Sequence, residues 1–152
     1  MTTRVVREMR SSDLPAVDSI ERCTFTLPWS PDVFETQVQS KSGITLAHEI
    51  DGVLVGYLVA DVFVDVWHIM NLAVAQDHRR DHVASDLLGA YFEITERAPH
   101  RGHTLEVRVS NQAAIELYRS FGFVVTGMRP RYYSDDYEDA LIMWKDWEGE
   151  SA

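Results

Sequence analysis

The chain has 152 residues, 45% of them hydrophobic, and a formal net charge of −10 at neutral pH. This length favours one domain of ordinary size, so we expect a single domain over residues 1–152. An acidic chain lacks the basic face and high pI of a non-specific nucleic-acid binder, so no direct nucleic-acid partner is expected. No apolar run approaches the roughly 20 residues that span a bilayer, which argues against a membrane partner.

Two further properties concern the cellular compartment and the kind of partner. Cys23 is the only cysteine, so an internal disulfide is excluded and a reducing, cytoplasmic setting is expected. The acidic charge suits a cationic partner such as a protonated amine or a basic peptide. Solubility alone explains the same charge, and both interpretations stay open at this point.

Hydrophobic periodicity and turn residues predict the secondary structure in chain order. Ser11 or Ser12 is expected to cap the first helix, and Ser30 to cap the second. Asp51-Gly52 is a strong hairpin signal between two strands. The expected elements are strand 3–9, helix 12–25, helix 31–40, strands 44–50, 53–64 and 66–75, helix 83–97, strand 103–109, helix 111–120, and strands 122–133 and 137–145.

This order mixes antiparallel hairpins with crossover connections through helices. Such a mixture is typical of the α/β class, here more strictly α+β. We therefore expect a mixed central sheet of about seven strands with four helices. Residues 66–75 are almost continuously apolar, which predicts that this strand is buried on both faces.

Residues 103–123 place a carboxylate and a phenol on neighbouring elements. In the alternating strand, Leu105 and Val107 are expected to face the core and Glu106 the opposite side. Tyr118 lies in the last turn of the helix that follows. A carboxylate can take a proton from an amine, and a phenol can return one to a leaving thiolate. A solvated Glu106, a Glu106–Arg108 ion pair and a core Tyr118 are the open alternatives.

The segment 76–88 leads from a strand into the start of the long helix. Free backbone N–H groups and the helix dipole make such a junction an anion site. His78 and His82 have the i, i+4 spacing of a metal pair. No third ligand accompanies them in the sequence, so no metal site is expected.

Residues 103–123, with their Leu-Glu-Val-Arg-Val-Ser-Asn run, strongly resemble the GCN5-related N-acetyltransferase (GNAT) superfamily, and within it the RimI-like ribosomal-protein alanine N-acetyltransferases. The resemblance extends over nearly the whole chain and implies the GNAT fold with acetyl-CoA as cosubstrate. It implies transfer of acetyl to a protein N-terminal α-amine by direct attack, with Glu106 as general base and Tyr118 as acid. Other acceptors (a small amine or lysine) and a non-catalytic binding module on the same fold remain open.

The resemblance also assigns binding residues. The family pattern Arg/Gln-x-x-Gly-x-Gly/Ala binds the cofactor's pyrophosphate, and here His82 stands at the first glycine position. Side chains do not fit easily where backbone must approach phosphate, so this is a departure from the family. The cofactor residues implied are Leu72, Ala73 and Val74 on the strand, Arg79, Arg80, Asp81, His82, Val83, Ala84 and Ser85 at the turn, and Asn111.

The acceptor side is implied by the same resemblance. Residues 128–143 resemble the family's last hairpin, and the segment around Trp29 lies between the first two helices. Trp29, Tyr132 and Tyr133 are the expected substrate-binding residues, and the acidic side chains of residues 135–139 are expected to attract a positive N-terminus. A ribosomal protein is the implied acceptor, although the sequence does not identify it.

Overall fold

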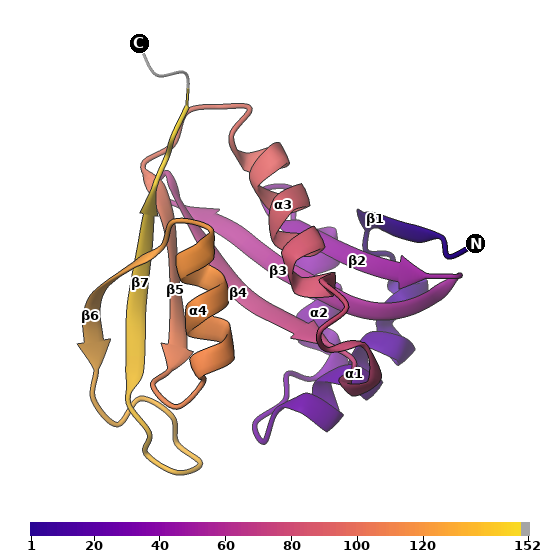
Figure 1. Ribbon diagram of the computed structural model, residues 1–152, viewed down its shortest axis with the longest axis horizontal. Helices are drawn as coiled ribbons and strands as arrows, with labels where there is room; N and C mark the ends of the chain where they lie inside the picture. Colours follow the sequence, from indigo (N-terminus) through magenta and orange to yellow (C-terminus); the bar gives the residue numbers. More distant parts are fainter. Residues whose placement is uncertain (150–152) are drawn as a thin grey trace.

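The computed structural model describes residues 1–149 and contains a seven-stranded mixed sheet with helices on both faces (Figure 1). The strand order is β1-β2-β3-β4-β5-β7-β6. The elements are β1 (Arg4–Glu8), α1 (Leu14–Thr24), α2 (Pro31–Gln39), β2 (Ile44–Ile50), β3 (Val53–Phe63), β4 (Val66–Val74), α3 (Val83–Thr95), β5 (Gly102–Arg108), α4 (Gln112–Ser120), β6 (Val124–Arg129) and β7 (Ala140–Asp146). The predicted α/β (α+β) class with about seven strands and four helices is confirmed.

Three predicted helix starts can be compared with the structure. The expected cap at Ser11 or Ser12 is wrong, because both residues lie in a short 3₁₀ turn and α1 begins after Asp13. Ser30 does occupy the N-cap position of α2, but its side chain makes no capping hydrogen bond. Asn111 caps α4, since its Oδ1 accepts a hydrogen bond from the Ala114 N–H at 3.2 Å.

The last hairpin has shorter strands than the alternation predicted. Residues 130–139 form a loop in which Arg131 and Tyr137 adopt positive φ angles of 52° and 59°. The Arg131 N–H donates to Asp139 Oδ1 at 2.8 Å, so a side chain replaces a strand partner there. Such side-chain bonds to backbone compete with a sheet ladder and are invisible to a hydrophobic pattern.

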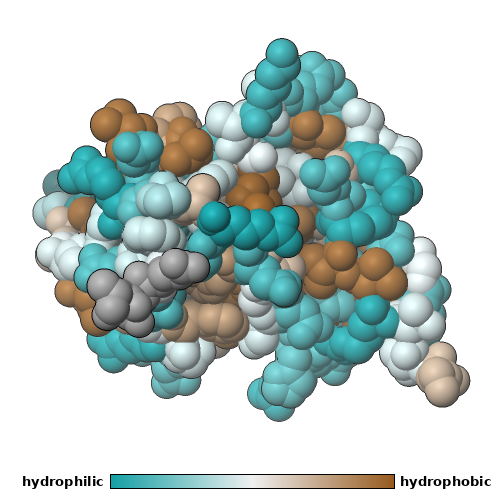
Figure 2. Space-filling view, turned by 90° about the horizontal axis from the view of Figure 1, so that it is seen from above, coloured by the Kyte–Doolittle hydropathy of each residue, from teal (hydrophilic) through white to brown (hydrophobic). Residues whose placement is uncertain are grey.

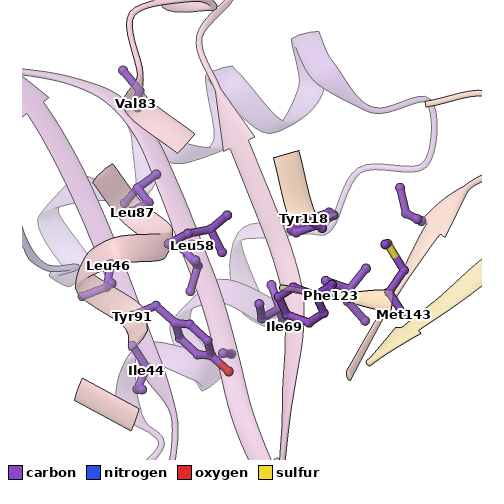
Figure 3. Packing of buried hydrophobic residues seen from close by; sticks show 14 of the residues in the cluster. Ile44, Leu46, Leu58, Ile69, Val83, Leu87, Tyr91, Tyr118, Phe123 and Met143 are labelled. Carbon is purple, nitrogen blue, oxygen red and sulfur yellow. The ribbon is translucent and has the colours of Figure 1, made fainter. Parts of the chain in front are cut away.

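Two hydrophobic clusters lie on opposite faces of the sheet. Helices α3 and α4 cover the first face, and α1 and α2 cover the second (Figure 1). Figure 3 shows the first cluster, where Tyr91 of α3 and Tyr118 of α4 pack with strand residues such as Leu58. Strand β4 contributes to both clusters, through Ile69 on the first face and Ala73 on the second, as its apolar sequence predicted.

The most consequential feature of the sheet is the short contact between β4 and β5. These parallel strands pair only over Val66–His68 and Gly102–Thr104. Beyond these residues they diverge, as Figure 1 shows, while β4 stays paired to β3 and β5 to β7. From Ile69 onward the edge of β4 that faces β5 therefore has no strand partner within residues 1–149.

The surface gives no sign of a membrane-spanning segment. Within residues 1–149, every helix is too short or too polar to cross a bilayer. Seen from above, hydrophilic side chains dominate and hydrophobic ones gather in separate patches (Figure 2). Among the exposed large hydrophobic residues are Val124 and Met128 on the edge strand β6.

The start of β5 requires glycine, which gives a stability prediction. Gly102 has a φ of +149°, and a Cβ there would lie 2.4 Å from Trp144 Cζ2 and 2.7 Å from Lys145 O. We expect Gly102→Ala to lower the free energy of unfolding by about 2–3 kcal/mol through overpacking. In Gly89→Ala, the matched control in α3, the new Cβ meets nothing within 4 Å, so unfolding free energy should rise by about 0.5–1 kcal/mol. Urea denaturation measures both, and equal effects of the two variants would contradict the prediction.

Candidate active site

The turn before α3 has the backbone geometry of an anion site. Arg80 and His82 adopt left-handed conformations with φ of 79° and 61°. His82 is the N-cap of α3, and its exposed side chain makes no capping hydrogen bond. The first N–H groups of the helix, on Val83, Ala84 and Ser85, have no intrahelical partner and remain available to a ligand.

The left-handed angle at His82 explains why glycine is the usual residue in the pattern. A non-glycine residue in this region costs roughly 1–2 kcal/mol because Cβ crowds the following carbonyl. Here histidine accepts the same backbone conformation, and the Asp86 N–H donates to the His82 carbonyl at 3.0 Å as the first turn of α3 forms. His82 thus adopts the left-handed conformation that favours glycine and still begins a regular helix.

A network of charges fixes the first turn of α3. Arg4 of β1 donates to the Asp81 carbonyl and pairs with Asp86 Oδ2 at 2.8 Å. Buried His48 of β2 lies 2.8 Å from the same carboxylate. Burial alone would raise the pKa of Asp86, but these two hydrogen bonds outweigh it and hold the pKa below its ordinary value. The Asp86 charge in the first turn of α3 is thus matched by Arg4.

The three β4 residues of the proposed cofactor site differ in how their side chains pack. Leu72 and Val74 pack against the α3/α4 cluster, whereas Ala73 belongs to the α1/α2 cluster. Their side chains are therefore core residues. Only their backbone groups on the edge facing β5 are free of a strand partner, and these can pair with an extended ligand as an added strand would.

Glu106 occupies the face of β5 opposite the α3/α4 cluster, as the alternation predicted. Leu105 and Val107 are 1% and 5% exposed. His68 Nε2 of β4 lies 2.7 Å from Glu106 Oε2, and Arg129 Nε of β6 lies 3.7 Å from Oε1. The hydrogen bond from His68 holds the pKa of Glu106 below its ordinary value and outweighs the effect of burial.

Arg108 does not pair with Glu106, which removes one alternative explanation of the glutamate. The Arg108 guanidinium instead donates to the carboxylates of Asp135, Asp136 and Glu138 in the β6–β7 loop. Its cation also lies 3.9 Å from the centre of the Tyr133 ring. This arginine therefore offsets one of the four negative charges of residues 135–139 that were expected to attract an acceptor amine.

Tyr118 lies on the other face of the sheet, in the α3/α4 cluster. It is 8% exposed, and its ring contacts Phe123 edge-on with centroids 5.6 Å apart. Burial raises the pKa of Tyr118, and nearby Tyr133 raises it further, so the phenol keeps its proton at neutral pH. Burial also raises the pKa of Tyr133 to about 12, with Glu106 contributing.

The two loops expected to form the acceptor walls meet in the structure. Thr26, in the α1–α2 loop, donates a hydrogen bond to Asp135 of the β6–β7 loop. Tyr132 is half exposed and its ring contacts Tyr133 edge-on. Trp29 packs on Phe34 with ring centroids 5.2 Å apart, so its ring anchors the loop.

A buried glutamate that the sequence analysis missed supports this loop. Glu21 of α1 is 1% exposed. Its Oε1 accepts hydrogen bonds from the Tyr57 hydroxyl at 2.6 Å and the Asn71 amide at 2.9 Å, and its Oε2 accepts one from the Trp29 N–H at 2.9 Å. Glu21 stands one turn after Val17 in the apolar stripe of α1. A charged residue within an apolar stripe was the feature of the sequence that could have revealed this buried network.

His68 was also missed, because the strand around it was interpreted only as core. It is the last β4 residue paired to β5, opposite Thr104, two residues before Glu106. Residues two apart on a strand share a face, so the glutamate lies one step beyond the last paired position. Only the register between β4 and β5 shows that this histidine reaches the carboxylate. That register cannot be read from the sequence.

Comparison with known proteins identifies the family. Residues 14–123 match the Acetyltransferase (GNAT) family. The chain is 38% identical over 144 residues to the putative [ribosomal protein bS18]-alanine N-acetyltransferase of Bacillus subtilis, covering 94% of this chain and 95% of the relative. This chain belongs to the GNAT family and is an N-acetyltransferase, which confirms the resemblance seen in residues 103–123.

Solved structures agree with this assignment. The ribosomal-protein-S18-alanine N-acetyltransferase of Escherichia coli superposes with a TM-score of 0.89 and 30% identity, over 99% of this chain and 97% of that one. Arabidopsis thaliana NAA60, solved in complex with acetyl-CoA, has a TM-score of 0.87 at 20% identity, over 97% and 100% of the two chains. The second similarity concerns the fold alone.

The Glu21 network gives a prediction about the acceptor loop. Glu21→Gln replaces one accepting oxygen with an NH₂ group facing buried donors, so we expect a loss of about 1–3 kcal/mol in unfolding free energy. The KM for an acceptor peptide should rise several-fold because the Trp29 segment loosens, while acetyl-CoA affinity stays the same. Urea denaturation, steady-state kinetics and calorimetry measure these three quantities.

The matched control is Asp18→Asn on the same helix. Asp18 makes a largely exposed i, i+4 pair with Arg22, which contributes at most about 0.5 kcal/mol. Equal stability of the Glu21→Gln variant and this control would show that the buried network does not support the loop.

Proposed function

We propose that this chain transfers acetyl from acetyl-CoA to the α-amine of a protein N-terminus by direct attack. The observation that carries the proposal is the opening between β4 and β5, with the Glu106 carboxylate on one face and the Tyr118 phenol on the other. An anion site lies at the α3 end of the same opening. These are the groups that a thioester, its diphosphate and an attacking amine require.

The cofactor is proposed to lie along this opening. Its pyrophosphate accepts hydrogen bonds from the N–H groups of residues 82–85, with Arg79 and Arg80 supplying positive charge. The pantetheine arm pairs with the free backbone edge of Leu72, Ala73 and Val74. Asn111, already the cap of α4, contacts the cofactor near its thioester.

Glu106 is proposed to accept the proton that the amine loses as its nitrogen attacks the thioester carbon. The lowered pKa of Glu106 keeps the carboxylate ionised at neutral pH. An α-amine with a pKa near 8 is about one-tenth neutral at pH 7, whereas fewer than about one lysine in a thousand is. A base of low pKa therefore suits an α-amine better than a lysine, and His68 orients the carboxylate for that task.

Tyr118 is proposed to protonate the thiolate as the carbon–sulfur bond breaks. Its raised pKa ensures that the hydroxyl carries a proton at the start of each turnover. Its burial in the α3/α4 cluster keeps the leaving sulfur away from bulk water. The phenolate regains its proton from solvent after the product leaves.

The acceptor is proposed to enter between the α1–α2 and β6–β7 loops, which the Thr26–Asp135 hydrogen bond joins. Tyr132 and Tyr133 line one wall and the Trp29 loop forms the other. Because the relatives are named for alanine at the N-terminus of ribosomal protein bS18, a ribosomal protein with N-terminal alanine is the proposed acceptor. The cytoplasm is its proposed place of action.

Peptide acetylation tests the proposed acceptor. We expect a peptide that begins with Ala and carries an internal Lys to gain one acetyl group, on the α-amine, in the presence of acetyl-CoA. Tandem mass spectrometry locates the group, and the same peptide with a blocked N-terminus is the control. Acetylation of the blocked peptide at Lys, at an equal rate, would favour the small-amine or lysine alternative.

Two substitutions test the catalytic pair. Glu106→Gln and Tyr118→Phe should each lower kcat by about 10²- to 10⁴-fold while acetyl-CoA affinity, measured by calorimetry, stays the same. Because the pKa of Glu106 is lowered, its carboxylate stays ionised from mildly acidic pH upward. The rise of kcat/KM with pH should therefore follow the acceptor amine, near pH 8, in the native chain and in Glu106→Gln.

A control for packing is Phe121→Leu, because Phe121 is the partly buried C-cap residue of α4, three residues after Tyr118. A rate loss in this variant as large as that in Tyr118→Phe would show that the phenol acts through packing alone. An acidic limb in the native pH profile that disappears in Glu106→Gln would contradict the pKa argument.

A further inference from the structure

A second group of potential ligands lies at the end of α3 opposite the proposed cofactor turn. Glu96 follows the last turn of α3, and His100 and His103 lie in and just after the connection to β5. One ligand atom from each residue lies within 4.8 Å of the others. Helix α3 is about 20 Å long, so this group is separated from the cofactor turn by the whole helix (Figure 1).

Several polar atoms in this group are buried without hydrogen-bond partners. The His100 side chain is 3% exposed, and neither of its ring nitrogens makes a hydrogen bond within residues 1–149. Glu96 Oε2 is also buried without one. Buried polar groups are nearly always satisfied, so unpaired donors and acceptors that converge on one point indicate a missing ligand.

The spacing fits a small divalent cation. Tetrahedral Zn²⁺ with bonds of about 2.0–2.1 Å places its ligand atoms roughly 3.3–3.4 Å apart. His100 Nε2 lies 3.4 Å from Glu96 Oε2, and His103 Nε2 lies 3.1 Å from Glu96 Oε1. Each histidine therefore lies at nearly this distance from one of the two Glu96 oxygens, and one ligand atom from each of the three residues lies within 4.8 Å of the others.

His103 has the surroundings of a metal-binding histidine. Its ring is fully buried and contacts the rings of Tyr91 and Phe92 edge-on. Its Nε2 forms a hydrogen bond with Glu96 Oε1 at 3.1 Å, a contact that a metal bound between the two atoms would replace, and its Nδ1 lies 2.6 Å from the Tyr91 hydroxyl. Such an outer hydrogen bond is typical of metal-binding imidazoles. Tyr91 is held firmly in the core cluster, as Figure 3 shows.

The charges around the group determine what it can hold. Glu96 contributes one negative charge. Lys145, which pairs with His103 across β5 and β7, contributes a positive one and is matched by Glu148, 2.6 Å from its Nζ. With the Lys145 charge balanced, one carboxylate and two imidazoles face the site, a set typical of Zn²⁺ with water as fourth ligand.

We propose that Glu96, His100 and His103 form a Zn²⁺ site that ties the end of α3 to the start of β5. The metal plays no part in acetyl transfer, because none of its ligands belongs to the proposed catalytic pair. His103, the ligand nearest in sequence, lies three residues before Glu106 on β5 and faces the opposite side of the sheet, against Tyr91 of α3. Its role is to hold the connection of residues 96–103, and through it the position where β4 and β5 pair. The expectation from sequence that the chain has no metal site considered only His78 and His82, and no metal-ligand group that includes them occurs within residues 1–149.

Zinc titration of tag-free protein, after removal of metals with a chelator, tests the proposal. We expect one Zn²⁺ per chain in a competition assay with a fluorescent indicator, and a rise in Tm on adding ZnCl₂. His100→Ala and Glu96→Gln should each weaken zinc affinity more than about tenfold, and Tyr91→Phe by about tenfold to a hundredfold. Their rates of acetyl transfer should match the native rate, which also shows that each variant folds.

His78→Ala is the matched control, because His78 also lies 3.1 Å from a carboxylate, Asp81, at the other end of α3. Its zinc affinity should equal that of the native chain. Absence of stoichiometric zinc binding would overturn the proposal. Binding that survives both His100→Ala and Glu96→Gln, or that is lost in His78→Ala, would also overturn it.

Discussion

The structure depends on one interruption of backbone pairing. After three residue pairs, β4 and β5 leave each other, and each keeps its partner on the far side. Unpaired backbone N–H and C=O groups inside a protein are costly, so an opened sheet is stable only if something satisfies these edges. A ligand that can pair like a strand is the natural solution, and acetyl-CoA has an amide-bearing arm of that kind. The same opening lets groups on opposite faces of the sheet, Glu106 and Tyr118, act on one molecule.

The parting of the strands also explains why the fold could be predicted better than the site. Helix and strand bounds follow from local periodicity, and all eleven helices and strands were found in their predicted order. The α1 cap was misplaced because Asp13, which accepts from the Arg10 N–H and pairs with Arg7, determines that turn. His68 and Glu21 were missed for another reason. Both depend on partners about 40 residues away, and single-sequence periodicity contains no such distances.

His82 stands where the family pattern has glycine, and it adopts a backbone conformation that favours glycine. The pattern asks for glycine, and the backbone angle at this position shows that the reason is conformational as well as steric. Histidine accepts that angle at a modest cost in stability, and Arg4 ties down the neighbouring turn through Asp81 and Asp86. The turn therefore keeps its shape through side-chain interactions elsewhere, where the family pattern uses glycine alone. An exposed imidazole then stands beside the place proposed for a diphosphate, where it can donate a hydrogen bond.

Helix α3 connects the proposed cofactor turn to the proposed metal site. Its first turn presents N–H groups to the proposed cofactor, and its last turn reaches the Glu96–His100–His103 group. Between them, Leu87, Leu88 and Tyr91 are fully buried against the sheet, so the helix behaves as one rigid element. Fixing one end therefore restricts the other. Because β5 begins at Gly102, between the two histidines of this group, a metal there would also hold the short β4–β5 pairing beyond which the strands part. In that arrangement the metal would set the width of the β4–β5 opening from the start of β5, at the end of α3 opposite to the cofactor turn.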